Sequence, residues 1–93
     1  MVIENTFRQK LIAGKPTIGT HFMFNDPDIP EMIGDSGFFD YGEFAAEYAS
    51  FDMDRLYHVA RSAQCGGLPL MIKPDQESQG FWSQAALGAG FKA

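Results

Sequence analysis

The chain has 93 residues, of which 45% are hydrophobic and 20% charged, and its formal net charge is −5. This length fits one domain or a piece of one, and the apolar fraction predicts a packed chain rather than a disordered one. The seven Lys and Arg residues are scattered, which argues against the clustered basic surface that nucleic-acid binding requires. No apolar run approaches the roughly 18 residues of a membrane-spanning helix, and a single cysteine cannot form an intrachain disulfide. We therefore expect a cytoplasmic protein with no nucleic-acid or membrane partner.

Three local patterns organise the first part of the chain. Asn5 is a suitable cap for a short leading helix over residues 5–13, whose apolar residues follow helical spacing. Residues 17–24 are rich in β-branched and aromatic side chains, which is typical of a buried strand. Asp26 and Pro27 then predict the cap and first position of a brief second helix, which ends at the glycines that follow.

The second part of the chain repeats the alternation of strand and helix. Residues 38–46 and 68–73 are candidate strands, and residues 91–93 would begin another. Asp52 caps the helix that the pattern predicts most clearly, and Ser78 begins the last helix. The apolar stripe of the helix after Asp52 comprises Leu56, Val59, Ala60 and Ala63. Because parallel neighbours need a helical crossover, this order predicts an α/β protein built from βαβ units with a parallel sheet.

Several catalytic signatures do not occur in the chain. The sequence has no P-loop, no dinucleotide-binding glycine motif after a strand, no His-Glu-x-x-His zinc motif and no nucleophile elbow. Kinase, dehydrogenase and serine-hydrolase functions therefore lose their usual support.

Polar residues follow the predicted strands at their carboxyl ends, the edge where parallel α/β folds build ligand sites. His21 lies near the end of the first strand, Glu47 and Tyr48 follow the second, and Lys73 ends the third. A lysine suits an anionic carboxylate, a histidine exchanges protons near neutral pH, and a tyrosine hydroxyl makes hydrogen bonds. Together these side chains would suit a small oxo acid. The alternative is structural: His21 would pack inside an apolar strand, and Lys73 and Glu47 would form an ordinary surface ion pair.

An ordered series of short matches along nearly the whole chain resembles the opening third of the HpcH/HpaI aldolases. The matching residues are Asn5 and Phe7; Gly14, Pro16, Ile18, Gly19 and Thr20; Asp26, Pro27 and Glu31; Ser36, Gly37, Phe38 and Asp40; Glu47, Tyr48, Ala49 and Asp52; Ile72 and Lys73; and Ala86 to Gly90. The resemblance implies a (β/α)8 barrel, of which residues 1–93 would be the N-terminal portion of a single domain, with a leading helix and about three βα units.

The same resemblance implies an aldehyde-lyase that cleaves a 4-hydroxy-2-oxo acid to pyruvate, or a related oxo acid, and an aldehyde. It implies a divalent metal, Mg²⁺, Mn²⁺ or Co²⁺, held by a Glu and an Asp of later strands, so no metal ligand is expected in this chain. The family's catalytic His matches Tyr48, its carboxylate-binding Arg matches Lys73, and the Asp that orients the His matches Gly88. A tyrosine with a pKa near 10 is a poor general base. We therefore hypothesise that His21 supplies the proton carrier, with Tyr48 beside it and Glu47 and Lys73 binding substrate.

A second interpretation is a non-catalytic module derived from the same family. About three of eight barrel units would leave sheet edges unpaired and apolar surface uncovered, which favours association. Such a half-barrel would bind an anion or associate with itself or with a complementary chain. On either interpretation we expect a homo-oligomer whose small-molecule partner is a 2-oxo acid.

Overall fold

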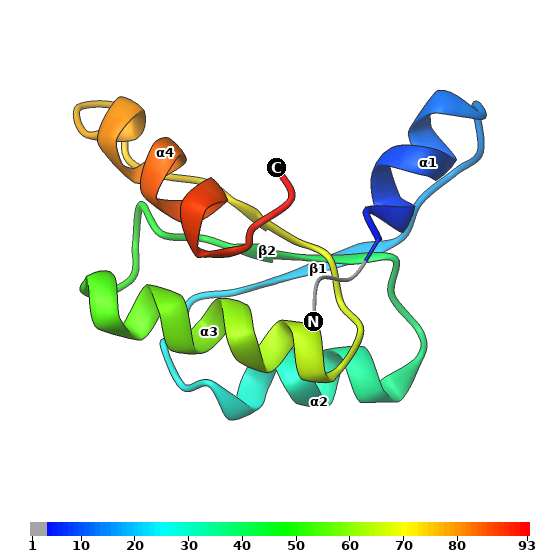
Figure 1. Cartoon of the computed structure of the whole chain (residues 1–93), viewed down its shortest axis with the longest axis horizontal. Helices are drawn as coiled ribbons and strands as arrows, with labels where there is room; N and C mark the ends of the chain where they lie inside the picture. Colours follow the sequence, from blue (N-terminus) through cyan, green and yellow to red (C-terminus); the bar gives the residue numbers. More distant parts are fainter. Residues whose placement is uncertain (1–3) are drawn as a thin grey trace.

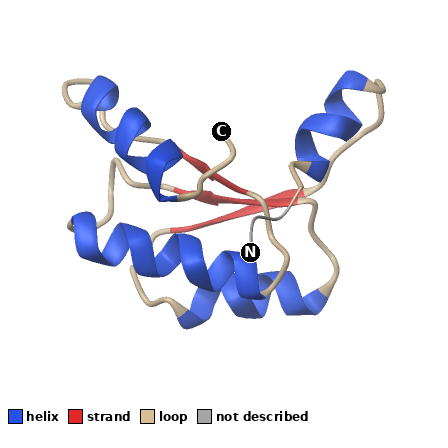
Figure 2. Cartoon of the chain, in the orientation of Figure 1, coloured by secondary structure: helices blue, strands red, loops and turns tan. Residues whose placement is uncertain are grey.

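The computed structural model describes residues 4–93, which form a three-stranded parallel sheet and four helices (Figure 1). The elements in chain order are α1 (Thr6–Ile12), β1 (Gly19–Phe22), α2 (Asp28–Ser36), β2 (Tyr41–Phe44), α3 (Met53–Cys65), β3 (Leu70–Ile72) and α4 (Gln79–Ala89). The strands lie in the order β1-β2-β3. Helices α2 and α3 lie side by side under one face of the sheet, and α1 and α4 lie at its two ends (Figure 2). The predicted α/β class and parallel sheet are confirmed.

The predicted helix caps are confirmed where they depend on local hydrogen bonds. The Asn5 side chain accepts from the Arg8 backbone N–H at 3.0 Å, and the Asp52 side chain accepts from the Arg55 N–H at 2.8 Å. The predicted start of α2 is displaced by one residue, because Asp26 accepts from the N–H of Asp28 and the helix begins there. Each of these helices is thus started by a carboxylate or amide oxygen that satisfies a free N–H of the first turn.

Two helices run through an inner glycine and end at the next one. Helix α2 does not end at Gly34 but runs to Ser36 and ends at Gly37, which has a φ of +73°. Gly34 lies inside the helix, where α2 approaches the end of α3. A Cβ at this position would overlap the backbone carbonyl of Gly66, so the close approach of the two helices requires a residue without a side chain. Similarly, α4 continues through Gly88 before it ends at Gly90.

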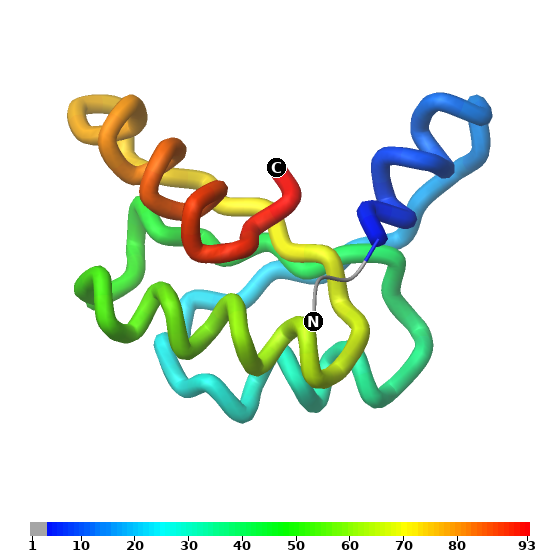
Figure 3. The backbone as a smooth tube through the Cα atoms, in the orientation of Figure 1, coloured from blue at the N-terminus to red at the C-terminus, as the bar shows by residue number. Residues whose placement is uncertain are grey.

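The strands are shorter than the apolar runs that predicted them. The runs 17–24, 38–46 and 68–73 contract to four, four and three paired residues, because only these lie opposite a neighbour in the ladder. Residues 91–93 do not form the expected further strand, but they lie beside β3: the Lys92 N–H donates to the Leu70 carbonyl at 2.7 Å, and the Ile72 N–H donates to the Ala93 carbonyl at 2.9 Å. The tube in Figure 3 shows the chain returning from α4 to the sheet at this point.

The hydrophobic core lies between the sheet and the helices. Phe44, the last residue of β2, is fully buried, and its ring centroid lies 5.4 Å from that of Phe22 and 5.3 Å from that of Phe51. Trp82 of α4 packs on Phe51 at 4.6 Å, which joins the last helix to this cluster. The predicted stripe of α3 faces the core, and its members Leu56, Val59, Ala60 and Ala63 are all buried. Within residues 4–93, no helix is long and apolar enough to cross a bilayer.

The opposite face of the sheet has no helical layer along most of its length. Because strand side chains alternate, this open face carries Gly19, His21, Tyr41, Glu43 and Met71, none of which is fully buried. Helix α1 covers only its amino end, where the ring of Phe7 lies 4.3 Å from that of Tyr41. The carboxyl end of the open face is therefore accessible, and the predicted site residues lie there.

Candidate functional site

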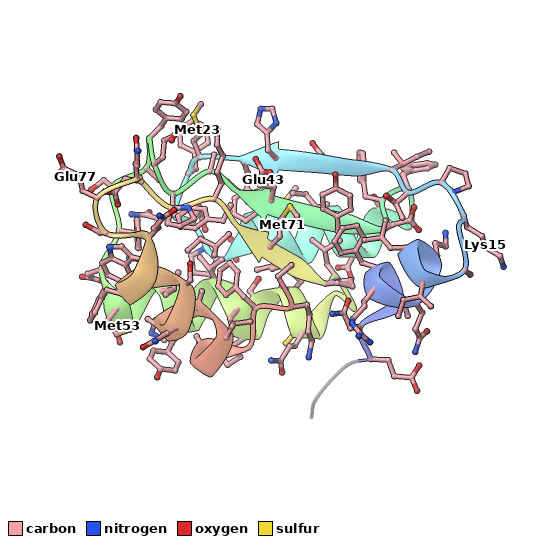
Figure 4. The ribbon with its side chains drawn as sticks, turned by 90° about the horizontal axis from the view of Figure 1, so that it is seen from above. Lys15, Met23, Glu43, Met53, Met71 and Glu77 are labelled. Atoms are coloured by element: carbon pink, nitrogen blue, oxygen red, sulfur yellow. The ribbon has the colours of Figure 1, made fainter. Side chains whose placement is uncertain are left out.

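A polar hollow of about 160 Å³ lies at the carboxyl end of the open face. The polar hollow is lined by His21, Met23, Glu43, Ala45, Tyr48 and Lys73. The register explains the convergence, since His21, Glu43 and Met71 are direct neighbours across the three strands. In Figure 4 the sheet is seen from this side, with Glu43 and Met71 on adjacent strands and Met23 beyond the end of β1. Three of the four predicted site residues thus share one hollow.

The fourth predicted residue, Glu47, forms an ion pair with Lys73 at the rim. Its Oε1 lies 2.9 Å from the Lys73 Nζ, and its backbone N–H donates to the Lys73 carbonyl at 3.0 Å. The Lys73 N–H donates in turn to the carbonyl of Phe44 at 3.0 Å, so the sheet positions both partners. The Lys73 ammonium also lies 5.7 Å from the centre of the Tyr48 ring. The surface ion pair considered from the sequence is therefore present, and it borders the hollow.

The Glu47–Lys73 ion pair and Tyr48 shift one another's pKa values. Hydrogen bonding with Tyr48, followed by the hydrogen bond from Lys73, lowers the pKa of Glu47. The Glu47 carboxylate raises the pKa of Tyr48 and of Lys73, chiefly through the same hydrogen bonds. In neutral solution Glu47 is therefore anionic, Lys73 cationic and Tyr48 a neutral hydroxyl. The tyrosine can donate a hydrogen bond, but it is even less suited to act as a base than an ordinary phenol.

His21 is exposed on the open face, so the alternative in which it packs inside an apolar strand is wrong. The reason is alternation, since its neighbour Phe22 takes the buried side. Glu43 is the lining residue that the sequence interpretation did not select, although the buried Gly42 and Phe44 on either side already indicate an outward direction. Its charge also acts on Lys73, where it helps to raise the lysine pKa.

The described residues do not offer the set of ligands that a metal ion needs. Residues 4–93 contain no group of three or more His, Cys, Asp or Glu side chains that could hold one, and the polar hollow offers only His21 and Glu43 as conventional ligands. Gly88, at the position of an orienting aspartate in the resemblance, is exposed on α4 and has no side chain to contribute. The residues of the hollow therefore do not make a metal centre by themselves.

No protein-family model matches the sequence, and no curated protein matches it either. Solved structures do. An HpcH/HpaI aldolase from Desulfitobacterium hafniense DCB-2 is 26% identical, with a TM-score of 0.74 over 90% of this chain and 32% of the aldolase. Citrate synthase SbnG has a TM-score of 0.78 at 17% identity over 95% of this chain and 35% of SbnG. A variant of SbnG gives 0.74 at 18% identity, over 91% of this chain and 35% of the variant.

The chain spans about a third of the length of these structures. At identities of 17% and 18%, the likeness to SbnG concerns the fold. The higher identity to the aldolase agrees with the ordered matches found in the sequence. The chain is thus an α/β protein with the fold of part of an aldolase-type barrel, and the family that it resembles is that of the HpcH/HpaI aldolases.

Proposed function

We propose that residues 1–93 are the N-terminal portion of a single barrel domain that acts as a carbon–carbon lyase of the HpcH/HpaI type. Its reaction would be the retro-aldol cleavage of a 4-hydroxy-2-oxo acid to pyruvate, or a related oxo acid, and an aldehyde. The observation that carries the proposal is the convergence of His21, Tyr48 and Lys73 on one hollow at the carboxyl ends of three parallel strands. This edge is where barrel enzymes place their catalytic groups.

Each side chain has a role that follows from its chemistry. Lys73 attracts the substrate carboxylate as a point charge, without the two-pronged grip of an arginine. His21 accepts the proton of the 4-hydroxyl as the C3–C4 bond breaks, the aldehyde leaves, and the electron pair remains on the oxo acid as its enolate. The imidazolium then returns the proton to C3, which completes pyruvate. Tyr48, held neutral by its hydrogen bond to Glu47, would exchange that bond for one to a substrate oxygen.

The divalent metal that the resemblance implies, Mg²⁺, Mn²⁺ or Co²⁺, would stabilise an enolate of this kind. Because residues 4–93 hold no suitable group of ligands, its ligands would come from elsewhere in the active assembly.

The decisive experiment measures pyruvate released from 4-hydroxy-2-oxo acids by the native gene product that carries this chain, with and without each of the three metals. We expect metal-dependent release. His21→Gln should reduce kcat by about 10²- to 10⁴-fold with little change in KM, whereas His58→Gln, on α3 and outside the polar hollow, should change neither. Absence of pyruvate under every condition would refute the lyase function, and a normal kcat in His21→Gln would refute the role of His21.

A non-catalytic half-barrel is a second candidate function, favoured by the amount of uncovered apolar surface. Ile18, Phe24 and Phe38 flank the strands and are 62%, 72% and 78% exposed. Surface of this kind on a soluble protein usually marks a contact with another chain. The chain would then assemble into a homo-oligomer and use Lys73 only to hold an anion. Sedimentation equilibrium tests the assembly, and a monomer at every concentration would remove this candidate.

A further inference from the structure

A second hollow, of about 290 Å³, lies directly beyond Tyr48. This apolar hollow is lined by Met23, Phe24, Asn25, Tyr48, Ala49 and Ser50. Its residues come from the two loops that follow β1 and β2, so it opens on the same edge of the sheet as the polar hollow. Met23 and Tyr48 line both hollows. The two spaces are therefore adjacent compartments separated by the same two side chains.

The walls of the apolar hollow are tied together by the fold. The Asn25 Nδ2 donates to the backbone carbonyl of Ser50 at 2.6 Å, which joins the two loops. Just below, the Ala45 N–H donates to the Phe22 carbonyl at 3.0 Å and holds the strand ends in register. No charged side chain lines this hollow, and Phe24 is 72% exposed. A ligand that covers this ring would remove apolar surface from water, which is favourable.

We infer that the apolar hollow receives the carbon chain of the aldehyde half of the substrate, and that this aldehyde is uncharged and hydrophobic. The inference rests on the proposed lyase function and deepens it. A 4-hydroxy-2-oxo acid carries its polar groups on the first four carbons, which suit the polar hollow with His21 and Lys73. Carbons beyond the fourth would pass Tyr48 and Met23 into the apolar hollow. An aldehyde with its own carboxylate would lose hydration there without finding a cation.

Synthesis in the aldol direction tests this assignment. With pyruvate held constant, kcat/KM should rise about two- to fourfold per added methylene from acetaldehyde through butanal to hexanal, and 4-oxobutanoate should react more slowly than butanal. Phe24→Ala should flatten the series, because it lowers kcat/KM for hexanal more than for acetaldehyde. Phe81→Ala removes another exposed ring, 61% exposed on α4 and outside this hollow, and should leave the series intact. A flat or falling series, or an equal loss for all aldehydes in Phe24→Ala, overturns the assignment.

A binding experiment separates failure of the hollow from failure of the lyase function. Hexan-1-ol is titrated against the protein labelled with ¹³C in its methionine methyl groups. The Met23 signal should shift and saturate, whereas Met32, which is 67% exposed on α2, should not, and Phe24→Ala should abolish the Met23 response. Equal responses of the two methionines overturn the assignment. If the protein is inactive with every aldehyde but the Met23 signal still saturates, the apolar site is retained and the lyase reaction is refuted.

Discussion

The ion pair at the rim of the polar hollow makes Glu47 a competitor of any anionic ligand. Its carboxylate lies 2.9 Å from the Lys73 ammonium, which is the cation that an oxo-acid carboxylate would approach. Replacing Glu47 with Gln removes the competing charge and keeps the size of the side chain. We therefore expect Glu47→Gln to bind pyruvate more tightly than the wild type. Lys73→Met should abolish the binding.

The size of the gain follows from the exposure of the pair. The Lys73 side chain is 53% exposed and that of Glu47 26%, and surface pairs of this kind are typically worth about 1.5- to 5-fold in an equilibrium constant. Pyruvate affinity, measured by calorimetry, should rise by that factor at about 0.01 M salt and by less at about 0.15 M, where charges are screened over about 8 Å. Glu77→Gln makes the same change of net charge on an exposed loop and controls for it. Unchanged or weaker binding in Glu47→Gln would show that the carboxylate positions Lys73 instead of competing.

Three further predictions concern stability, and urea unfolding followed by circular dichroism measures each. Leu56→Ala, at a fully buried site, should lower the free energy of unfolding by about 2–5 kcal/mol, and Leu87→Ala, 57% exposed, by less than about 0.5 kcal/mol; equal effects would contradict the described core. Gly34→Ala, where a Cβ meets backbone, should destabilise by about 1–3 kcal/mol, whereas Gly80→Ala, with nothing within 4 Å, should stabilise by up to about 1 kcal/mol. Hydrogen bonds from α1 and from a backbone N–H lower the pKa of Asp40, so its contribution is present above the ordinary Asp value of about 3.9 and disappears as the pH falls through the lower folded value. Asp40→Asn should therefore weaken the fold near neutral pH and make unfolding less pH-dependent below about pH 4; an unchanged acid limb would argue against the pair.

Features set by neighbouring residues could be predicted from the sequence. Asn5 and Asp52 cap helices by accepting from N–H groups three residues away, so each interaction depends only on residues close together in the sequence. The stripe of α3 follows from helical spacing alone. The strand ends were predicted too far out, since Phe24 and Phe38 have the composition of a strand but no paired neighbour, and both remain exposed.

Features that depend on distant contacts could not be predicted. Gly34 resembles a helix stop in the sequence, and only the approach of Gly66 explains why it lies inside α2. The ion pair of Lys10 with Asp40 at 2.5 Å joins residues 30 positions apart. That the site residues meet at one edge of the sheet could be predicted, because parallel strands bring their carboxyl ends together. The apolar hollow could not be predicted, because its two walls are joined by the hydrogen bond between Asn25 and Ser50, which lie on different loops.

The stacking of Phe7 on Tyr41 covers the amino end of the open face and leaves its carboxyl end uncovered. The Tyr41 ring lies over Gly19, where an added Cβ would overlap the phenol ring. The Phe7–Tyr41 pair therefore packs on a residue that has no side chain. Phe7 and Tyr41 cover only the amino end, so His21 and Glu43 stay accessible on the open face and toward the loops that follow the strands. A side chain at position 19 would displace the Tyr41 ring and uncover the amino end of this face, without altering any group that lines the polar hollow.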